Sequence, residues 1–75
     1  MPRELTTRQA AILRYVLQCW MSGFMPSIRE IGIDQDIRSP NGVVCHLDAL
    51  RRKGYLEEAD NTSLMLSDKA LELVL

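Results

Sequence analysis

The sequence predicts a mainly α fold with a small β-hairpin, in the order helix, helix, helix, hairpin, helix. Four Ser or Thr residues stand where helix N-caps are expected: Thr6, Ser27, Ser39 and Ser67. Apolar residues recur with a helical period up to Gly54, and shorter apolar runs then flank the turn-rich segment 60–63. With 75 residues, 47% of them hydrophobic, the chain can build one modest core. Residues 1–75 are therefore expected to form a single small domain.

The first helix is predicted from Thr6 to about Met21. Thr6 and Gln9 have the spacing of a capping box, in which each side chain binds the backbone N–H of the other residue. Gly23 and Pro26 end the helix. Residues at helical spacing form the expected inward face: Ile12, Val16, Cys19 and Trp20, with Tyr15 beside them.

The second helix is short. Ser27 and Glu30 form another capping box, and the helix that they open is predicted to reach about Gln35. Within it, Ile28 and Ile31 are expected to point into the core.

A tight turn is predicted between the second and third helices. Gly32 weakens the second helix by about 1 kcal/mol relative to Ala, which a close helix crossing would explain. Asp36 follows where the turn is needed, and Asp tolerates left-handed backbone better than most residues. Ser39-Pro40 then supplies an N-cap and a first helical residue, and the third helix runs over residues 39–53 and stops at Gly54.

The pattern changes after the third helix. Two short strands around a turn are predicted within residues 55–66, and Ser67 begins a final helix over 67–75. A short helix, a tight turn and a longer helix form the helix-turn-helix pattern, here over residues 27–53. The hairpin makes the predicted fold a winged helix-turn-helix, with a three-helix core, a two-stranded wing and a C-terminal helix.

The charge is small overall but uneven along the chain. The net charge of −1 argues against a generally basic nucleic-acid coat or a membrane-surface binder. Residues 1–53 carry eight basic and five acidic side chains, a balance of +3, whereas residues 54–75 carry one and five, a balance of −4. A partner with phosphates is therefore expected to meet the first two-thirds of the chain. An accidental asymmetry of a solvated surface explains the same charge balance equally well.

The sequence lacks the residues that several classes of function require. Cys19 and Cys45 stand 26 positions apart in a chain with one His, so we expect two reduced thiols rather than a metal site. The apolar stretch 10–25 contains Arg14 and is no membrane span, and residues 1–9 are unlike a signal peptide. No catalytic triad, pair of catalytic carboxylates or phosphate-binding glycine loop can be assembled. We therefore expect a cytoplasmic protein that is not an enzyme and takes no cofactor or small-molecule ligand.

The third helix has two distinct faces when it is wound at 100° per residue. The core face comprises Val43, Leu47 and Leu50, with His46 at its edge. The outer face comprises Asn41, Cys45, Asp48 and Arg52, with Val44 and Ala49 at its flanks. In a helix-turn-helix protein the N-terminal part of this helix enters the DNA major groove.

These positions predict which residues contact the bases and which contact the phosphates of double-stranded DNA. Asn41 and Cys45 are assigned to bases, because Asn can bind adenine through two hydrogen bonds and small apolar groups can contact the thymine methyl. Phosphate contacts are assigned to Ser39, Arg8, Arg29 and Arg52. Two alternatives to base contact remain open: Asn41 forms hydrogen bonds only with local backbone groups, and Cys45 is a neutral surface residue. Asp48 would repel phosphate and counts against DNA binding.

Four segments resemble the DNA-binding domain of LexA, the bacterial SOS repressor. They are LTTRQ at 5–9, GFMPSIREI at 23–31, RSPNG at 38–42 and HLDALRRKG at 46–54. The resemblance covers about residues 4–66 and implies a winged helix that docks its third helix in an operator and represses transcription. The positions that it implies for operator contact are Ser39, Asn41, Gly42, Val44 and Cys45.

The match departs from LexA in three places. LexA of the enterobacterial type carries two Glu residues where this chain has Val44 and Cys45, and a basic residue in place of Asp48. A Leu-Gly pair at the end of the second helix is replaced by Gln35-Asp36. Nothing in the sequence resembles the LexA peptidase domain, so self-cleavage does not follow. The chain is expected to be either a detached fragment or a stand-alone regulator, and a folded final helix favours the second.

Two further expectations concern partners. Leu13, Leu17 and Met21 form a second apolar stripe that a three-helix core would leave exposed. The last helix offers Leu71, Val74 and Leu75 to cover it, within one chain or between two. Because small DNA-binding modules commonly pair on two half-sites, we predict a homodimer through these two stripes. The rival interpretation is a winged-helix protein–protein adaptor without DNA binding, favoured by a pI near 5.7 and the acidic wing.

Overall fold

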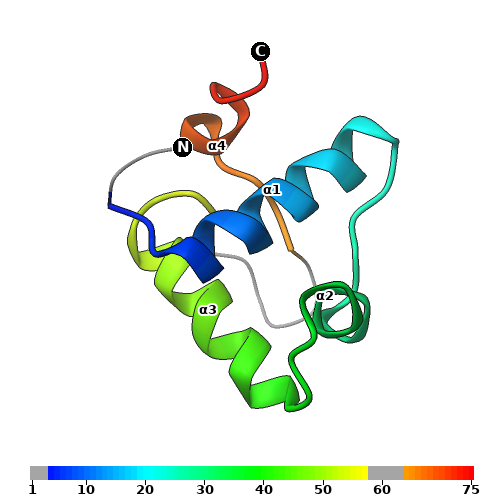
Figure 1. The fold of residues 1–75 in the computed structure, drawn as a ribbon. Helices are drawn as coiled ribbons and strands as arrows, with labels where there is room; N and C mark the ends of the chain where they lie inside the picture. Colours follow the sequence, from blue (N-terminus) through cyan, green and yellow to red (C-terminus); the bar gives the residue numbers. More distant parts are fainter. Residues whose placement is uncertain (1–3, 58–63) are drawn as a thin grey trace.

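The computed structural model describes residues 4–57 and 64–75, and this part of the chain is mainly helical. The helices are α1 (Thr7–Met21), α2 (Ile28–Gln35), α3 (Pro40–Arg52) and a short α4 (Asp68–Leu71). Helices α1, α2 and α3 each pack against the other two, while α4 lies at the far side of α1 from α2 (Figure 1). The order and bounds predicted for the first three helices are confirmed, and α3 is helical throughout.

The predicted caps position the first two helices. The hydroxyl of Thr6 accepts a hydrogen bond from the backbone N–H of Gln9 at 3.1 Å, and the Gln9 side chain accepts one from the N–H of Thr6 at 3.2 Å. Ser27 and Glu30 form the same reciprocal pair, with both bonds at 3.1 Å. Each box satisfies backbone donors that the first turn of a helix leaves without partners, so the sequence defines where α1 and α2 begin.

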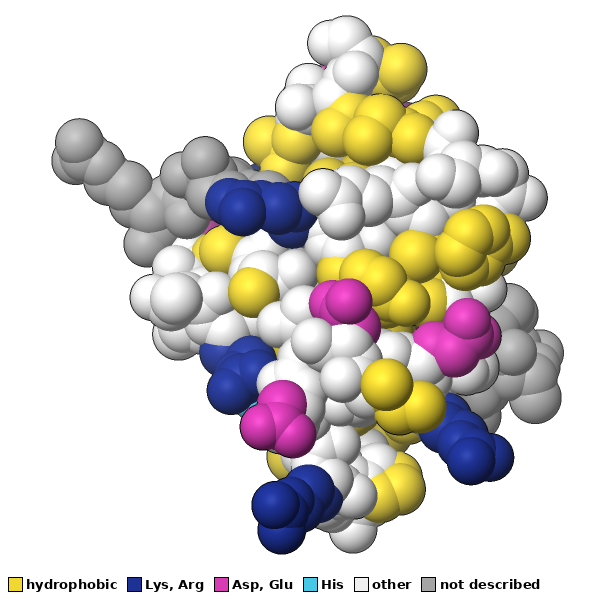
Figure 2. Space-filling view, turned by 45° about the vertical axis from the view of Figure 1, so that its right-hand side comes forward, with side chains coloured by type: hydrophobic (Ala, Val, Ile, Leu, Met, Phe, Trp, Pro, Cys, Tyr) yellow, Lys and Arg dark blue, Asp and Glu magenta, His cyan; other side chains and the backbone are white. Residues whose placement is uncertain are grey.

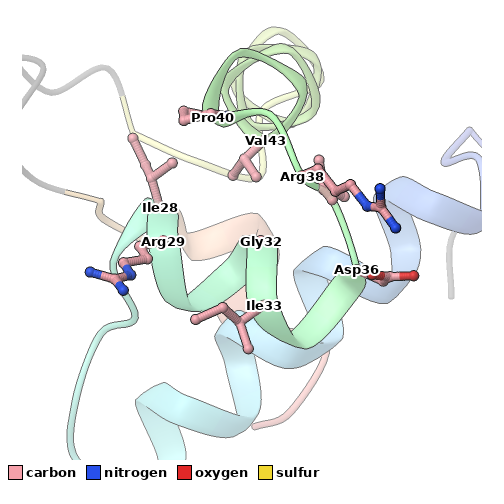
Figure 3. A pocket seen from close by; sticks show the side chains of 9 residues that line it. Ile28, Arg29, Gly32, Ile33, Asp36, Arg38, Pro40 and Val43 are labelled. Carbon is pink, nitrogen blue, oxygen red and sulfur yellow. The ribbon is translucent and has the colours of Figure 1, made fainter.

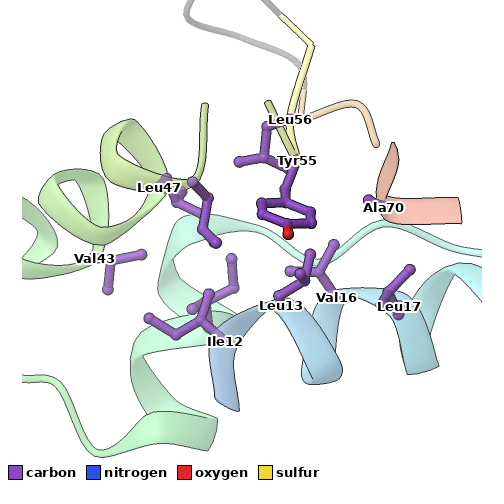
Figure 4. Close-up of a cluster of buried hydrophobic side chains, with 11 residues drawn as sticks. Ile12, Leu13, Val16, Leu17, Val43, Leu47, Tyr55, Leu56 and Ala70 are labelled. Atoms are coloured by element: carbon purple, nitrogen blue, oxygen red, sulfur yellow. The ribbon is translucent and has the colours of Figure 1, made fainter. Parts of the chain in front are cut away.

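One hydrophobic cluster joins all the elements. It contains Ile12, Leu13, Val16 and Leu17 from α1, Ile31 from α2, Val43, Leu47 and Leu50 from α3, and Tyr55, Leu56 and Ala70 beyond them. Figure 4 shows Tyr55 and Ala70 on the side of α1 that presents Leu13 and Leu17. Helix α1 is therefore buried on two sides, between the α2–α3 pair and the segments that follow α3.

This packing corrects three predictions about apolar side chains. Leu13 and Leu17 are buried within the chain, so these two members of the stripe are already covered on a monomer, whereas Met21 is 57% exposed. Trp20 and Ile28, expected to point inward, are each 39% exposed, because the end of α1 and the start of α2 extend past the core. Ala49, expected at the flank of the outer face of α3, is buried.

Two glycines lie close to Ile37, in the turn between α2 and α3. A Cβ atom on Gly32 would lie 2.9 Å from the carbonyl oxygen of Ile37 and 3.5 Å from Cγ2 of Val43, so only Gly permits this approach. A Cβ atom on Gly42 would lie 2.9 Å from Cγ2 of Ile37. Asp36 ends α2 with left-handed backbone, at φ 55° and ψ 44°, as its position in the sequence predicts.

The chain after Gly54 is only partly paired where the wing was expected. Leu56 and Leu66 form an isolated antiparallel bridge, and the N–H of Glu57 donates to the carbonyl of Met65 at 2.8 Å. Residues 58–63 of the predicted hairpin lie outside the described residues, and no strand is formed in 4–57 or 64–75. The final helix, expected over 67–75, ends at Leu71, because the following turns tighten to i−3 hydrogen bonds such as Val74 N–H to the Leu71 carbonyl.

Candidate nucleic-acid interface

The outer face of α3 is an exposed ridge, and the buried face of the same helix sets its direction. Val43 and Leu47 are buried against the core, which turns Asn41, Val44 and Cys45 toward solvent. Asn41 and Cys45 lie one helical turn apart and so are neighbours on this ridge. The structure therefore brings together the predicted base-contacting residues at the N-terminal end of α3.

The start of α3 leaves polar groups available for a ligand. Ser39 has the extended backbone of an N-cap, at φ −100° and ψ 128°, yet its side chain makes no capping hydrogen bond. The expected cap at Ser39 is thus present in backbone geometry but not in side-chain bonding. Its exposed hydroxyl lies beside the positive end of the α3 dipole, where anions are favoured.

The four predicted phosphate contacts are not equivalent. Arg29 is exposed in the first turn of α2, and Arg52 is exposed in the last turn of α3. Asn41 and Arg52 share a face but stand about 16 Å apart along the helix axis. The guanidinium of Arg8 instead donates to the carbonyl of Gln35, which joins the first turn of α1 to the C-terminal end of α2. Arg8 therefore supports the placement of the helix-turn-helix.

The charge of Asp48, which counted against DNA binding, is compensated within α3. Its carboxylate accepts a hydrogen bond from the guanidinium of Arg51 at 2.7 Å, one turn further along the helix. The Nε of Arg51 also donates to the carbonyl of Glu57 at 3.3 Å. The outer face consequently presents a paired carboxylate, which repels a phosphate backbone less than an isolated one.

Arg38 is a candidate that the helical pattern missed. It is exposed in the turn between α2 and α3, directly before Ser39. Figure 3 shows Arg38 and Arg29 projecting to opposite sides of the α2–α3 crossing. A helical wheel cannot place a turn residue, but a basic residue next to an N-cap is the signal that would have found it.

A surface pocket of about 740 Å³ lies between α2 and the start of α3. Its lining comprises Ile28, Arg29, Gly32, Ile33, Asp36, Ile37, Arg38, Pro40 and Val43 (Figure 3). The lining is mostly apolar, and the side chain of Ile33 is 73% exposed at its edge. On the face that Figure 2 draws, basic and acidic groups are interspersed among apolar side chains and do not form one continuous basic patch.

A polar cluster lies at the opposite end of α3. The carboxylate of Glu4 accepts hydrogen bonds from the Tyr55 hydroxyl at 2.7 Å and from Lys69 Nζ at 2.9 Å. Lys53, the C-cap of α3, donates to the side chain of Gln9 at 2.7 Å. These contacts fasten the N-terminal segment and α4 to the end of α3, away from the exposed ridge.

The same contacts shift the ionisation of the cluster. The hydrogen bond from Tyr55, followed by that from Lys69, lowers the pKa of Glu4 below its ordinary value. The hydrogen bond to Glu4 raises the pKa of Lys69. Burial, followed by the hydrogen bond to Glu4, raises the pKa of Tyr55. At neutral pH the cluster therefore holds a charged carboxylate and ammonium around a neutral phenol.

The described part of the chain was compared with the requirements of metal binding, disulfide formation and membrane insertion. Within residues 4–57 and 64–75, no three His, Cys, Asp or Glu side chains are grouped so that they could hold a metal ion. Cys19 is buried, Cys45 is exposed, and both are free thiols. None of the described helices has the length and apolar character needed to cross a membrane.

Comparison with known proteins agrees with this arrangement. Residues 2–64 match the LexA DNA binding domain family. The chain is 52% identical to the LexA repressor of Myxococcus xanthus over 64 residues, which are 84% of this chain and 29% of that protein. It is 46% identical to the LexA repressor of Sorangium cellulosum over 69 residues, or 91% of this chain and 30% of that protein.

A third LexA repressor supplies a similar match. The LexA repressor of Pseudothermotoga lettingae is 49% identical over 57 residues, which are 75% of this chain and 28% of that protein. The chain thus spans less than a third of the length of these three relatives. The family match covers α1, α2 and α3, including the exposed ridge, and ends before α4. This chain therefore belongs to the LexA DNA-binding domain family.

Proposed function

We propose that this protein is a sequence-specific double-stranded DNA-binding transcription regulator that acts as a repressor. The observation that carries the proposal is the exposed ridge of α3, which holds Asn41 and Cys45 outward while Val43 and Leu47 anchor the helix in the core. The membership of the LexA DNA-binding domain family supports the same function. Because the proposed ligand is DNA, we also propose a cytoplasmic location. We propose no catalytic activity for these residues.

In the proposed complex, the N-terminal half of α3 lies in the major groove. Asn41 and Cys45 contact base edges, and Gly42 and Val44 complete the segment that faces the bases. Phosphate contacts come from the exposed side chains of Ser39, the N-cap of α3, of Arg29 on α2 and of Arg52 on α3. Contacts to phosphates give affinity but little sequence preference. Arg8 acts indirectly, through its bond to the end of α2.

A two-stranded wing over residues 55–66 belongs to the same proposal. The Leu56–Leu66 bridge supports it, together with two flanking backbone bonds: Glu57 N–H to the Met65 carbonyl at 2.8 Å, and Ser67 N–H to the Tyr55 carbonyl at 3.1 Å. These bonds follow an antiparallel pattern at the base of a hairpin. Cross-strand nuclear Overhauser effects between residues 56 and 66 and between residues on both sides of 60 would test it.

Binding as a homodimer on two half-sites is also proposed, because one small module buries little DNA-contacting surface. Leu13 and Leu17 are buried within the chain, so neither is available to the dimer surface. Light scattering with and without a two-half-site duplex checks the stoichiometry, and one copy per duplex at high micromolar protein would reject this part of the proposal.

The main test separates base contacts from phosphate contacts. A binding site is selected from random duplexes, and the Kd is measured on the selected and on random DNA at several salt concentrations. Asn41→Ala should lose about 1–3 kcal/mol on the selected site and little on random DNA. Arg29→Ala should weaken both equally and lower the salt slope by about one unit. Arg14→Ala removes the same charge from the exposed side of α1 and serves as the control.

The outcome also decides between regulator and adaptor. A winged-helix adaptor would select no duplex and would be indifferent to Asn41→Ala and Arg29→Ala in every DNA assay. The pairing of Asp48 with Arg51 weakens the case for an adaptor, since the acidic group on the outer face is compensated. If Asn41→Ala leaves the preference for the selected site unchanged, the assignment of the recognition face is wrong.

A further inference from the structure

We propose that α3 reads a half-site core made of A·T pairs, in which Asn41 binds an adenine and Val44 with Cys45 packs on the 5-methyl group of a nearby thymine. This inference rests on the proposed DNA-binding function and names the class of sequence that the same surface recognises. It depends on the side chains that are present on the exposed ridge and on those that are absent from it.

The ridge presents one amide next to an apolar pair. Val44 and Cys45 lie three and four residues after Asn41, so both side chains adjoin Asn41 on the helix surface. Val44 is 36% exposed and Cys45 is also exposed, although both are apolar and could have been buried. Helical side chains lean toward the helix N-terminus, which directs both toward the end of α3 that enters the groove.

The spacing of these residues matches neighbouring base pairs. Asn41 and Cys45 are separated by about 6 Å along the helix axis. Stacked base pairs are separated by about 3.4 Å, so the adenine and the thymine methyl are expected within about two base-pair steps of each other. In the major groove, adenine offers the N6 donor and N7 acceptor that an Asn amide matches, and only thymine carries a methyl group.

The usual reader of guanine is absent from this part of the helix. The sequence from Pro40 to Leu50 contains no Lys or Arg, the side chains that most often bind guanine O6 and N7. Asp48 could accept a hydrogen bond from cytosine, but its carboxylate is held by Arg51 at 2.7 Å. The nearest arginines are Arg38, in the turn before the helix, and Arg51 and Arg52, in its last turn.

Base analogues in the selected duplex test this directly. Each thymine of the half-site is replaced in turn by deoxyuridine, which removes only the methyl group, and each purine by its 7-deaza analogue, which removes only N7. Deoxyuridine at one or two positions should weaken binding about fourfold each, the factor that corresponds to about 0.8 kcal/mol for one buried methyl group. 7-Deazaadenine should weaken binding at one position, and 7-deazaguanine should be tolerated at any guanine of the half-site.

Two variants assign the effect to the ridge. Val44→Ala and Cys45→Ser change exposed side chains, so the fold is kept and circular dichroism verifies it. The fourfold effect of deoxyuridine should fall below twofold in at least one variant, while Arg14→Ala retains it in full. Thymines outside the protected footprint provide the control within the DNA.

The results separate this inference from the function on which it rests. If a duplex is selected but deoxyuridine has no effect at any half-site position, or the same effect in the wild type and both variants, the inference is overturned and the DNA-binding function stands. A selected core of G·C pairs with sensitivity to 7-deazaguanine has the same meaning. If no duplex is selected, the proposed function fails and this inference fails with it.

Discussion

Replacing Gly32 by Ala tests whether the close crossing of α2 and α3 holds the helix-turn-helix in place. The added Cβ atom would lie 2.9 Å from the carbonyl oxygen of Ile37, closer than such atoms are found in proteins. That oxygen belongs to the backbone of the turn, and the N–H of Ile37 already donates to the Gly32 carbonyl at 2.8 Å. The clash therefore cannot be relieved by rotating a side chain, and the turn must move.

The net effect is the difference between two opposing contributions. Ala stabilises the interior of a helix by about 1 kcal/mol relative to Gly. Overpacking costs about 1–3 kcal/mol, and weakening the Ile37–Gly32 backbone bond costs about 1 kcal/mol more. Gly32→Ala should therefore lower the free energy of unfolding by about 1–3 kcal/mol. For a domain of this size, 1 kcal/mol shifts Tm by about 4–8 °C, so a loss of at least about 4 °C is expected.

Gly42→Ala is the matched control, measured by the same thermal and urea unfolding curves. Its Cβ atom would also approach to 2.9 Å, but the atom that it meets, Cγ2 of Ile37, belongs to a side chain and not to the backbone of the turn. The gain in helix propensity should then offset most of the cost, leaving the stability within about 1 kcal/mol of the wild type. If Gly32→Ala is as stable as Gly42→Ala, the backbone contact does not constrain the turn and this reasoning fails.

Three further predictions concern other parts of the fold. Asp36→Gly should raise the free energy of unfolding by about 0.5–1 kcal/mol in urea titrations, since Asp36 has φ 55° and Gly adopts this backbone without strain; an unchanged midpoint would contradict it. Because the pKa of Glu4 is lowered, its stabilising contribution is present above the ordinary carboxyl pKa and is lost as pH falls through the lowered one, so the Tm difference from Glu4→Gln should shrink in acid. The pKa of Lys69 is raised, so its contribution is instead lost at alkaline pH. In native protein a thiol reagent should modify Cys45 at once and Cys19 only on unfolding, and equal rates would refute the burial of Cys19.

Local signals in the sequence predicted the helices well. The capping boxes at Thr6 and Ser27 fix where α1 and α2 begin, because the partners are three residues apart and need no distant contact. The left-handed Asp36 and the need for Gly32 followed from the same short-range reasoning. The exposed ridge around Asn41 was also predictable, since one helical period separates it from the buried positions.

Contacts between distant segments were beyond this reasoning. Helix α1 is apolar on two sides, and nothing in its own sequence shows that Tyr55 and Ala70 cover Leu13 and Leu17. The bond from Arg8 to Gln35 joins residues 27 positions apart and changes the role expected for that arginine. The assignments to bases and phosphates concern a partner molecule and stay predictions.

The cluster around Glu4 brings the two ends of the described chain together. Glu4 and Lys69 are 65 positions apart in sequence but 2.9 Å apart in space, beside the C-cap of α3. This junction lies about 18 Å along the helix axis from the first residue of α3. A short linker between the two ends, with new termini opened in the 22–26 connection, should therefore give a circular permutant that keeps the ridge intact.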